Sequence, residues 1–549
     1  MQYTMFLTTI IEICKYKMMY NTIIVYTLMI VYLILGEILM ESNQRTKNTV
    51  FNIYASLIYQ IVSGLLNFVV RKVFLIYFSV DYLGLDGLFS NVINMLTLLD
   101  FGIGPSCVYF IIKSLANEDE DDFSTSYKLY SYLYKAVGII IAIAGVFICF
   151  HLDWFIEAES MQNYNTRFIQ VVFILTFLRS LTFYFFSCPR TTMLYAQKNY
   201  LNMITNTCVT IVFAFIKIGS LIITHNYYIY LTVLLFEILF YYLFGYIIFK
   251  NLYPNIKTDS KKLKAKLPDV LGYSRKILIS NVSLFLFNST DNIIISKFLG
   301  LSIVGLMSNY YMIVNLIGTF ANQIFEAATG SVTNFVNDKK ANSIDKMNEL
   351  MSTLNFIAFI VANFCATCLF ALTDGFIGVF YGWNLVLGKE VILALVINII
   401  IVVFQNPLSA YSNGRGLINY EVKYTILMSV VNIALSILLS NRIGVLGVLI
   451  GTIVANLILL YGRYNVVFNN LNLDKKNYVK KIVVYFAVIL FNFLIINLVF
   501  SNNGNFINLI IRGLFSVFII TIETLCFRNY EEYQSTLNFV KSFLHLNRR

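Results

Sequence analysis

The sequence predicts an all-α polytopic membrane protein with about 14 transmembrane helices, arranged as two homologous six-helix lobes and two further C-terminal helices. Three observations indicate this fold class. Of the 549 residues, 58% are apolar and only 13% are charged, and the mean hydropathy is +0.73, far outside the range of soluble domains. The apolar residues form runs long enough to cross a bilayer. Two motifs also recur at nearly the same distance along the chain, which indicates a duplication.

The apolar runs set the number of spans. A helix of about 20 residues crosses a bilayer core of roughly 30 Å. Val137–Phe150 (VGIIIAIAGVFICF) and Val391–Phe404 (VILALVINIIIVVF) have no polar face, as expected for helices surrounded by lipid. The predicted spans centre near residues 60, 97, 139, 177, 213, 239, 284, 315, 362, 400, 430, 454, 488 and 516.

Residues 1–40 form an apolar N-terminal extension outside this count. One interpretation is that Asn21–Met40 (NTIIVYTLMIVYLILGEILM) is an uncleaved signal anchor; the other is a misplaced start, with the native chain beginning at Met40. The anchor would place Lys15 and Lys17 outside, against the usual charge bias. No small-residue cleavage site follows the run, which disfavours a removed signal peptide.

Loop charges predict the orientation, because cytoplasmic loops carry an excess of Lys and Arg. When the loops are assigned alternately to the two sides, one set holds 28 Lys and Arg and the other only 6, among them Arg71, Lys72 and Lys297. We therefore predict a multi-pass protein with both termini cytoplasmic if the chain starts near Met40. Orientation and contact with the lipid bilayer explain the net charge of +11, so it requires no nucleic-acid partner.

The duplication rests on two independent motifs. Leu83–Asn91 (LGLDGLFSN) recurs as Leu299–Asn309 (LGLSIVGLMSN), and seven of nine positions agree once two residues are allowed for in the second copy. Pro189–Tyr200 (PRTTMLYAQKNY) recurs as Pro407–Tyr420 (PLSAYSNGRGLINY), with the prolines 218 residues apart. Each offset equals six spans, so the two copies have the same orientation in the membrane.

The copies define the predicted domains. They are an N-lobe of spans 1–6 (41–256), a basic cytoplasmic linker (257–271), a C-lobe of spans 7–12 (272–466), and spans 13–14 with a cytoplasmic tail (467–549). Two lobes related by an axis along the membrane normal are a common arrangement for alternating access. The alternative is a duplication retained only for folding.

The second span contains a candidate hinge. Phe101–Pro105 (FGIGP) lies within it, where Pro105 removes a backbone hydrogen bond, and Gly102 and Gly104 permit bending. The alternative is that these glycines serve static packing between helices.

Two segments resemble a known family. Arg45–Glu120 (RTKNTVFNIYASLIYQIVSGLLNFVVRKVFLIYFSVDYLGLDGLFSNVINMLTLLDFGIGPSCVYFIIKSLANEDE) resembles the start of Wzx-type polysaccharide or O-antigen repeat-unit flippases, and so does Asn288–Gly318 (NSTDNIIISKFLGLSIVGLMSNYYMIVNLIG). That family belongs to the multidrug/oligosaccharidyl-lipid/polysaccharide (MOP) exporter superfamily, which also contains the MATE drug antiporters and the lipid II flippases. The resemblance runs from about residue 45 to 465 and, more loosely, to the C-terminus.

The resemblance implies a function in the cytoplasmic membrane of a bacterium. The protein would move an undecaprenyl-pyrophosphate-linked oligosaccharide repeat unit to the outer leaflet for capsule, exopolysaccharide or O-antigen synthesis. A polysaccharide polymerase and co-polymerase would then be its partners.

An anionic head group requires cations or hydrogen-bonding groups within the membrane, where charges are costly. Arg179 in span four and Lys217 in span five are the main candidates for pyrophosphate contacts, and Lys135 in span three is a third. Arg71, at the outer end of span one, is a candidate for receiving or releasing the head group. Snorkelling, ion pairing or interfacial anchoring is the alternative role for these cations.

The remaining candidates are acidic and amide side chains. Asp100, Asp291 and Glu326 lie within spans and either pair with cations or bind a coupling ion. Asn67 and Asn288 either bind sugar hydroxyls or cross-link helices.

Other site types lack support in the sequence. Gly382–Lys389 (GWNLVLGK) has five residues between its glycines instead of the four of a phosphate loop, so no nucleotide cofactor is expected. No metal site is expected, because the three histidines are scattered and Cys365 and Cys368 lie in an apolar run. We therefore predict a transporter and not an enzyme. The alternatives are a MATE-like drug or cation antiporter, which favours acidic cavity residues, and a membrane polysaccharide polymerase, which the short outer loops disfavour.

Overall fold

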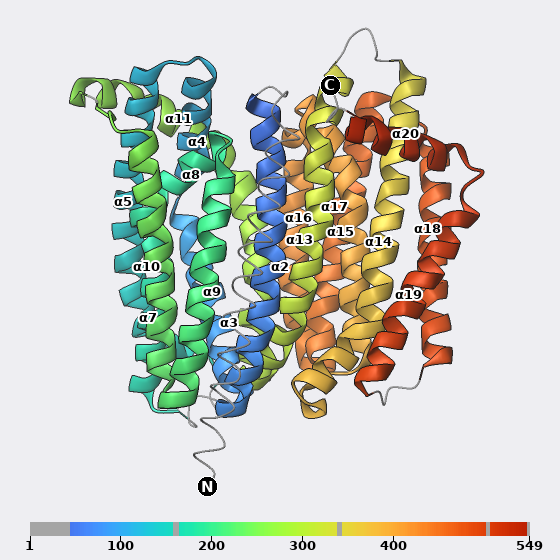
Figure 1. Cartoon of the computed structure of the whole chain (residues 1–549), viewed down its shortest axis with the longest axis horizontal. Coiled ribbons are helices and arrows are strands. Elements are labelled where there is room, and N and C mark those ends of the chain that lie inside the picture. Colours follow the sequence, from blue (N-terminus) through green and yellow to red (C-terminus); the bar gives the residue numbers. More distant parts are fainter. Residues whose placement is uncertain are drawn as a thin grey trace, which may run out of the picture.

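The computed structural model describes residues 44–100, 102–157, 164–257, 259–337, 343–500 and 505–545. Within these residues every regular element is a helix, and the helices form a two-lobed bundle (Figure 1). The predicted fold class is therefore confirmed. The predicted extension, residues 1–40, lies outside the described residues.

The N-terminal lobe is built from the helices up to Leu252. Its apolar side chains pack into one core that includes Phe89, Tyr130 and Phe173. The elements are α2 (Gln44–Tyr77), α3 (Val80–Leu96), η1 (Thr97–Asp100), α4 (Ile103–Ala116), α5 (Glu120–Cys149), η2 (Leu152–Trp154), α7 (Thr166–Phe186), α8 (Cys188–Tyr195), α9 (Asn199–Thr224) and α10 (Tyr227–Leu252).

The C-terminal lobe has a second core, which includes Phe356 and Phe404 and extends to Phe493. Its elements are α11 (Ser260–Ser289), α12 (Asp291–Leu299), α13 (Leu301–Asn337), α14 (Ile344–Phe380), η3 (Trp383–Leu385), α15 (Lys389–Arg415), α16 (Ile418–Ile443) and α17 (Val445–Leu471), followed by α18 (Lys475–Val499), α19 (Phe506–Cys526) and α20 (Glu531–His545).

Twelve helices in the described part are long and apolar enough to cross a membrane, and they coincide with twelve predicted spans. The exceptions are the spans predicted near residues 97 and 284. Near residue 97 the chain forms α3, η1 and α4 in succession, and near residue 284 it forms α11 followed directly by α12. Both exceptions are therefore interrupted helices rather than single long ones.

The interruption before α4 lies at the predicted hinge. Gly102 has a φ of +73°, a left-handed conformation that glycine adopts without a steric penalty. Asp100 accepts a hydrogen bond of 3.2 Å from the backbone N–H of Gly104 and so caps α4. Pro105 lies in the first turn of α4, where its missing N–H costs no helical hydrogen bond. A bending motion about this break stays a prediction.

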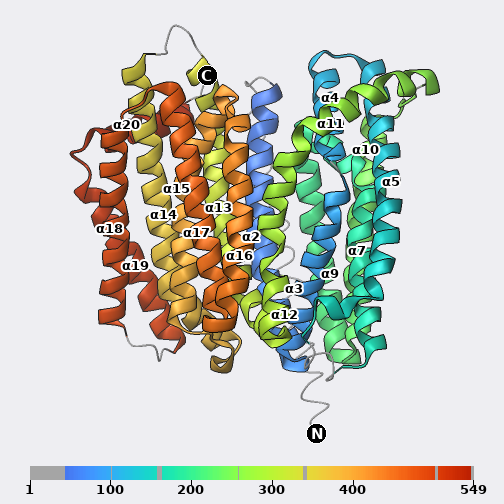
Figure 2. The ribbon, with the colours of Figure 1, turned by 180° about the vertical axis from the view of Figure 1, so that it is seen from behind.

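Apart from the contacts of the first half of α11, the two lobes meet at one end of the bundle. We call the end that holds the start of α11, the α4–α5 connection and α20 the linker end, and the opposite end the far end (Figure 1). Contacts between the lobes at the far end join α3 of the N-terminal lobe to α12 and α13 of the C-terminal lobe, and Figure 2 shows these helices together.

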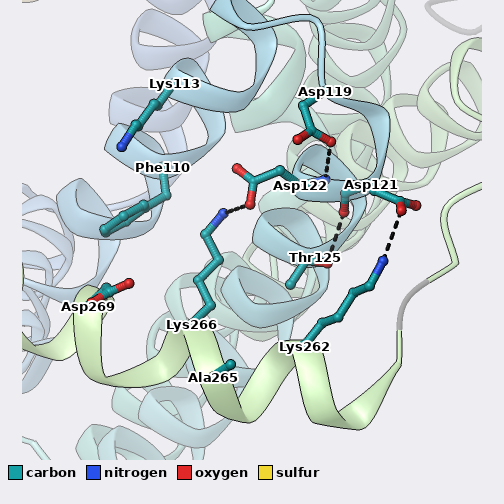
Figure 3. A pocket seen from close by; sticks show the side chains of 10 residues that line it. All are labelled: Phe110, Lys113, Asp119, Asp121, Asp122, Thr125, Lys262, Ala265, Lys266 and Asp269. Carbon is teal, nitrogen blue, oxygen red and sulfur yellow. Dashed lines mark hydrogen bonds and ion pairs between the residues drawn. The ribbon is translucent and has the colours of Figure 1, made fainter.

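At the linker end the first half of α11, which contains most of the predicted linker, binds the N-terminal lobe. Lys262 pairs with Asp121 at 2.8 Å, and Lys266 pairs with Asp122 (Figure 3). Lys266 also donates a 2.6 Å hydrogen bond to Ser126. A polar pocket of about 590 Å³ lies between these elements. The hydrogen bond to Asp121 raises the pKa of Lys262 above its ordinary value. We call these two ion pairs the linker clamp.

Helices α18 and α19, which have no copy in the repeat, dock on α14 through a buried polar cluster. The Glu523 carboxylate of α19 accepts hydrogen bonds from Asn363 of α14 at 2.7 Å and Asn492 of α18 at 2.9 Å. Asn492 also donates to Asn363 at 2.9 Å. The amides thereby satisfy a carboxylate that the apolar surroundings would otherwise disfavour.

Candidate functional site

The two copies of the glycine motif pack against each other at the far end. A Cβ added to Gly84 of α3 would lie 2.1 Å from the carbonyl oxygen of Leu301, and one added to Gly305 of α13 would lie 2.1 Å from the carbonyl oxygen of Val80. Gly84 thus packs against the backbone of the second copy, and Gly305 packs against the backbone of α3 three residues before the first copy begins. Only glycine allows so close an approach of two helices.

A pair of equivalent residues fastens this crossing. Asp81 and Lys297 stand two residues before Leu83 and Leu299, the first residues of the two copies. Asp81 accepts hydrogen bonds from Ser302 of the opposite lobe and from Tyr164 of its own lobe.

Lys297 makes the reverse connection. It donates to the backbone oxygens of Asp153, at 2.8 Å, and Ile156, at 3.3 Å, in the N-terminal lobe. Burial and the hydrogen bond to Asp81 raise the pKa of Tyr164 to about 12, so its hydroxyl stays protonated and donates at neutral pH.

Arg71 adds a third inter-lobe connection. Its guanidinium donates to Ser308, at 2.9 Å, and to Asn309, at 2.8 Å, which are the last two residues of the second copy. We call the inter-lobe contacts of Arg71, Asp81, Gly84, Lys297 and Gly305 the gate. Arg71 and Lys297 therefore hold the lobes together. Both belong to the six Lys and Arg residues predicted on the non-cytoplasmic side of the membrane.

Arg179 lies beside the gate. It is paired at 3.3 Å with Asp86 of α3, and the two side chains are 26% and 39% exposed. The sequence analysis did not predict a role for Asp86. The available signal was a difference between the two copies of the motif, because the first has the acidic Asp86 after Leu-Gly-Leu and the second has Ser302. Because the pair is partly exposed, Arg179 can exchange its carboxylate partner for another anion.

The other two predicted cations lie away from the lobe interface. Lys217 of α9 is bonded to both carboxylate oxygens of Glu237 of α10 at 3.1 Å, and the pair is largely buried within the N-terminal lobe. This geometry favours a packing role for Lys217. Lys135 is exposed in a groove formed by α5, α7, α8 and α10.

Helix α2 has two faces of different character. Gln60, Ser63, Asn67 and Arg71 follow one another at three- and four-residue steps and share one side of the helix. Asn67 is exposed and donates to Ser63 at 3.3 Å. The large exposed apolar side chains lie on the opposite side, which suits lipid; they are Ile61, Leu65, Val69 and Ile76.

Two central helices of the C-terminal lobe continue this polar surface. The exposed positions of α13 between Leu301 and Phe325 are Ser302, Asn315, Thr319, Asn322 and Ile324. On α15, which is mostly buried, Asn398, Val402, Asn406, Ser409 and Asn413 are less buried and share one side of the helix. Asn406 donates to Asn322 at 3.2 Å and so joins the two rows.

We call this surface the inter-lobe polar face; it comprises Gln60, Ser63, Asn67, Asn315, Thr319, Asn322, Asn398, Asn406, Ser409 and Asn413. Amides on lipid-exposed helix surfaces are costly, which indicates that these rows face a hydrated space. Apart from Arg71 at the far end of the α2 row and Val402 in the α15 row, this side of the helices carries amides and hydroxyls. Apart from Asn67, its asparagines were missed because the abundance of Asn in the chain was discounted. The helical spacing of the polar residues was the available signal.

The predicted acidic residues have different surroundings. Asp100 caps α4 and accepts a 3.3 Å hydrogen bond from Tyr134. Asp291, at the start of α12, accepts a 3.0 Å hydrogen bond from Thr452, which in turn accepts one of 3.1 Å from Asn432. No Lys or Arg pairs with Asp291 within the described residues. The side chains of Asn288 and Glu326 lie outside the described part of the structure.

Comparisons with known proteins agree with this architecture. A family model described as "Polysaccharide biosynthesis protein" matches residues 49–329. Among solved structures, the chain is similar to "Lipid II flippase MurJ, inward closed conformation", with a TM-score of 0.64, 15% identity and coverage of 88% of this chain and 99% of that chain. No curated protein sequence matches the chain significantly.

Two transporters of the MATE family also have a similar fold. An inward-facing multidrug resistance transporter of the MOP superfamily gives a TM-score of 0.58 at 16% identity, covering 75% of this chain and 95% of that chain. The eukaryotic MATE transporter AtDTX14 gives a TM-score of 0.53 at 14% identity, covering 78% and 96%. At these identities the likeness shows the fold alone.

Proposed function

This chain belongs to the polysaccharide biosynthesis protein family, and from that premise we propose that it is a flippase for undecaprenyl-pyrophosphate-linked oligosaccharide repeat units. It moves them from the cytoplasmic to the outer leaflet by alternating access, for capsule, exopolysaccharide or O-antigen synthesis. Its location is the cytoplasmic membrane of a bacterium, with the linker end cytoplasmic and, if the chain starts near Met40, both termini cytoplasmic. A polymerase and co-polymerase take up the product.

The chemistry of the cargo sets the physical problem. A sugar and pyrophosphate head cannot cross hydrocarbon, whereas a polyprenyl tail can remain in it. A hydrated surface between two lobes lets the head pass while the tail stays in the lipid.

The inter-lobe polar face is the observation that carries this proposal. Asn side chains both donate and accept hydrogen bonds, as sugar hydroxyls do, so rows of Asn, Ser and Thr suit an uncharged glycan. A cation antiporter would instead favour carboxylates on this face. The neutral composition therefore supports the flippase over the MATE-like antiporter, and the transporter fold supports both over a polymerase.

The pyrophosphate requires a cationic contact, and Arg179 supplies it in this proposal. A pyrophosphate that replaces Asp86 can bind the guanidinium in a bidentate manner. Arg71 then receives the head group once the gate opens and its bonds to Ser308 and Asn309 are broken. Lys217, held by Glu237, keeps α9 against α10.

Ion coupling is assigned to Asp291. It is a carboxylate without a cationic partner in the described structure, and its neighbours Thr452 and Asn432 carry oxygens of the kind that hard cations bind. A monovalent cation or a proton at Asp291 would link α12 to α16 and α17.

The leaflet distribution of lipid-linked oligosaccharide in cells depleted of the protein tests the proposal. We expect accumulation on the cytoplasmic face, corrected by the native chain but not by Arg179→Ala. Arg167→Ala, on the same helix but at its far-end terminus, serves as the matched control and should correct the defect. An unchanged distribution together with failed export of a small cation would refute the flippase and favour the antiporter.

A further inference from the structure

A groove of about 850 Å³ lies on the side of the N-terminal lobe that faces the bilayer. Its walls come from α5, from the junction of α7 and α8, and from α10. Helices α5, α7 and α10 form the edge of the bundle farthest from the C-terminal lobe (Figure 1). The groove therefore opens to lipid and is separate from the inter-lobe polar face.

The groove is polar toward the linker end and apolar deeper in the membrane. Tyr127, Ser131 and Lys135 stand at four-residue steps on α5, which aligns them on one side of the helix. Helix α10 runs in the opposite direction and places Tyr242 and Tyr246 toward the same end. The deeper lining of α10 is apolar and consists of Phe236, Leu239 and Phe240.

Lys135 is the only cation among the residues that line this groove. It is exposed, and no acidic side chain pairs with it in the described structure. Counted back from Cys149 across a core of roughly 30 Å, it lies about 9 Å inside the linker-side boundary of the hydrocarbon. Its side chain can extend toward that boundary, where an anion would offset the cost of the charge.

A second groove of about 710 Å³ lies on the adjacent side of α10, toward α9. Phe236 and Phe240 line both grooves and form the ridge between them. A lipid with two acyl chains can therefore lay one chain on each side of this ridge.

We propose that the two grooves bind one anionic phospholipid of the linker-side leaflet. Its phosphate contacts the Lys135 ammonium and the Ser131 hydroxyl, and its two chains lie on either side of Phe236 and Phe240. The occupant is a phospholipid and not the polyprenyl cargo, because there are two apolar grooves for two chains, and both open to the bilayer rather than between the lobes.

Native mass spectrometry of the full-length protein in detergent tests this site. The probes are phosphatidylglycerol and phosphatidylcholine with identical acyl chains, and undecaprenyl phosphate. We expect Lys135→Gln to weaken phosphatidylglycerol binding roughly tenfold, as removal of a charge-assisted contact does, and to leave phosphatidylcholine binding unchanged. Lys135→Arg should retain binding. Lys480→Gln, which removes an exposed cation of the C-terminal lobe, is the matched control.

A filled groove gives a second, independent readout. Ser131→Phe keeps Lys135 but occupies the space beside it, so it should also reduce phosphatidylglycerol binding. Equal binding by native protein, Lys135→Gln and Ser131→Phe would overturn the proposal. Lys135-dependent binding of undecaprenyl phosphate without such binding of phosphatidylglycerol would also overturn it and would assign the groove to a polyprenyl lipid.

Discussion

Asp81 and Lys297 occupy equivalent positions in the two copies of a repeated motif, and each is hydrogen-bonded to the opposite lobe. The carboxylate binds the Ser302 hydroxyl, whereas the ammonium binds the Asp153 carbonyl. Gly84 and Gly305 pack beside this pair, each against a backbone carbonyl of the opposite lobe. The duplication thus supplies both sides of one inter-lobe contact.

The gate depends on the two glycines. Gly84→Ala or Gly305→Ala places a methyl group against a backbone carbonyl, which cannot move without shifting the helix. We expect the free energy of unfolding, or the free energy that favours the closed gate, to fall by about 1 to 3 kcal/mol. Thermal unfolding measures the first, and chemical cross-linking between the lobes measures the second. Gly219→Ala is the control, since a Cβ there would meet nothing within 4 Å. Equal behaviour of all three variants would contradict the gate.

Arg71 should hold the far end closed. Arg71→Ala removes the bonds to Ser308 and Asn309, so the population with an open far end should rise on the order of tenfold. The measurement is the distance between spin labels attached at Tyr77→Cys and Trp383→Cys, in a protein from which the native cysteines have been removed. These two exposed positions lie at the far end in different lobes. Lys72→Ala should leave the distance distribution as in the native protein. A distribution that is insensitive to Arg71→Ala would show that this bond does not hold the gate.

Variants of Lys217 and Glu237 can show whether Lys217 serves helix packing or substrate binding. Lys217→Met alone leaves a buried carboxylate unpaired and should lower stability by about 3 to 5 kcal/mol. The double variant Lys217→Met, Glu237→Met should recover most of that stability and should also flip its cargo. Thermal unfolding and the leaflet assay measure the two effects. A double variant that is stable but does not flip the cargo would contradict the packing role and would indicate that Lys217 binds substrate.

The inter-lobe polar face should govern transport more than stability. Asn322→Ala with Asn406→Ala removes one hydrogen bond between α13 and α15 and two sugar-binding groups, so flipping should fall severalfold with little change in unfolding temperature. Asn477→Ala, at an exposed position of α18, is the control. If the double variant flips its cargo at the native rate, Asn322 and Asn406 do not contact the cargo.

The linker clamp should weaken in alkali. Because the pKa of Lys262 is raised in the folded protein, its contribution is complete below the ordinary value of 10.5 and is lost as the pH rises through the higher folded value. The protection factor of amides near the start of α11, which is the intrinsic exchange rate divided by the observed rate at the same pH, should therefore fall above pH 10.5 and also with added salt. Asp122→Asn should show the same fall at neutral pH, whereas Glu120→Gln should not. A pH-independent protection pattern would contradict the clamp.

Much of the fold could be predicted because membrane insertion depends on local composition. Twelve spans were placed from runs of apolar residues alone, and Gly102 marked a break within the second span. The other interrupted span, near residue 284, is divided at Thr290, between α11 and α12. The break lies in a run of five polar residues, 288–292, and a window average hides it because the longer stretches before and after the run are apolar.

The site was less predictable from sequence. Lys217 was singled out because a charge within a span is costly, and Arg71 because it lies at the outer end of span one against the charge bias. Their partners, Glu237 and Asn309, belong to other helices. Asn322 and Asn406 were passed over because one sequence does not distinguish a biased composition from a functional row.

The sequence by itself determined that this chain is a duplicated membrane bundle, because hydropathy and repeat spacing are properties of contiguous residues. Only the tertiary structure decided that the two glycine motifs pack against each other, that Arg179 faces Asp86, and that Lys135 lies in a lipid-facing groove. Those relationships depend on which helices are neighbours and how they are rotated, and these are set by side-chain packing across the whole bundle.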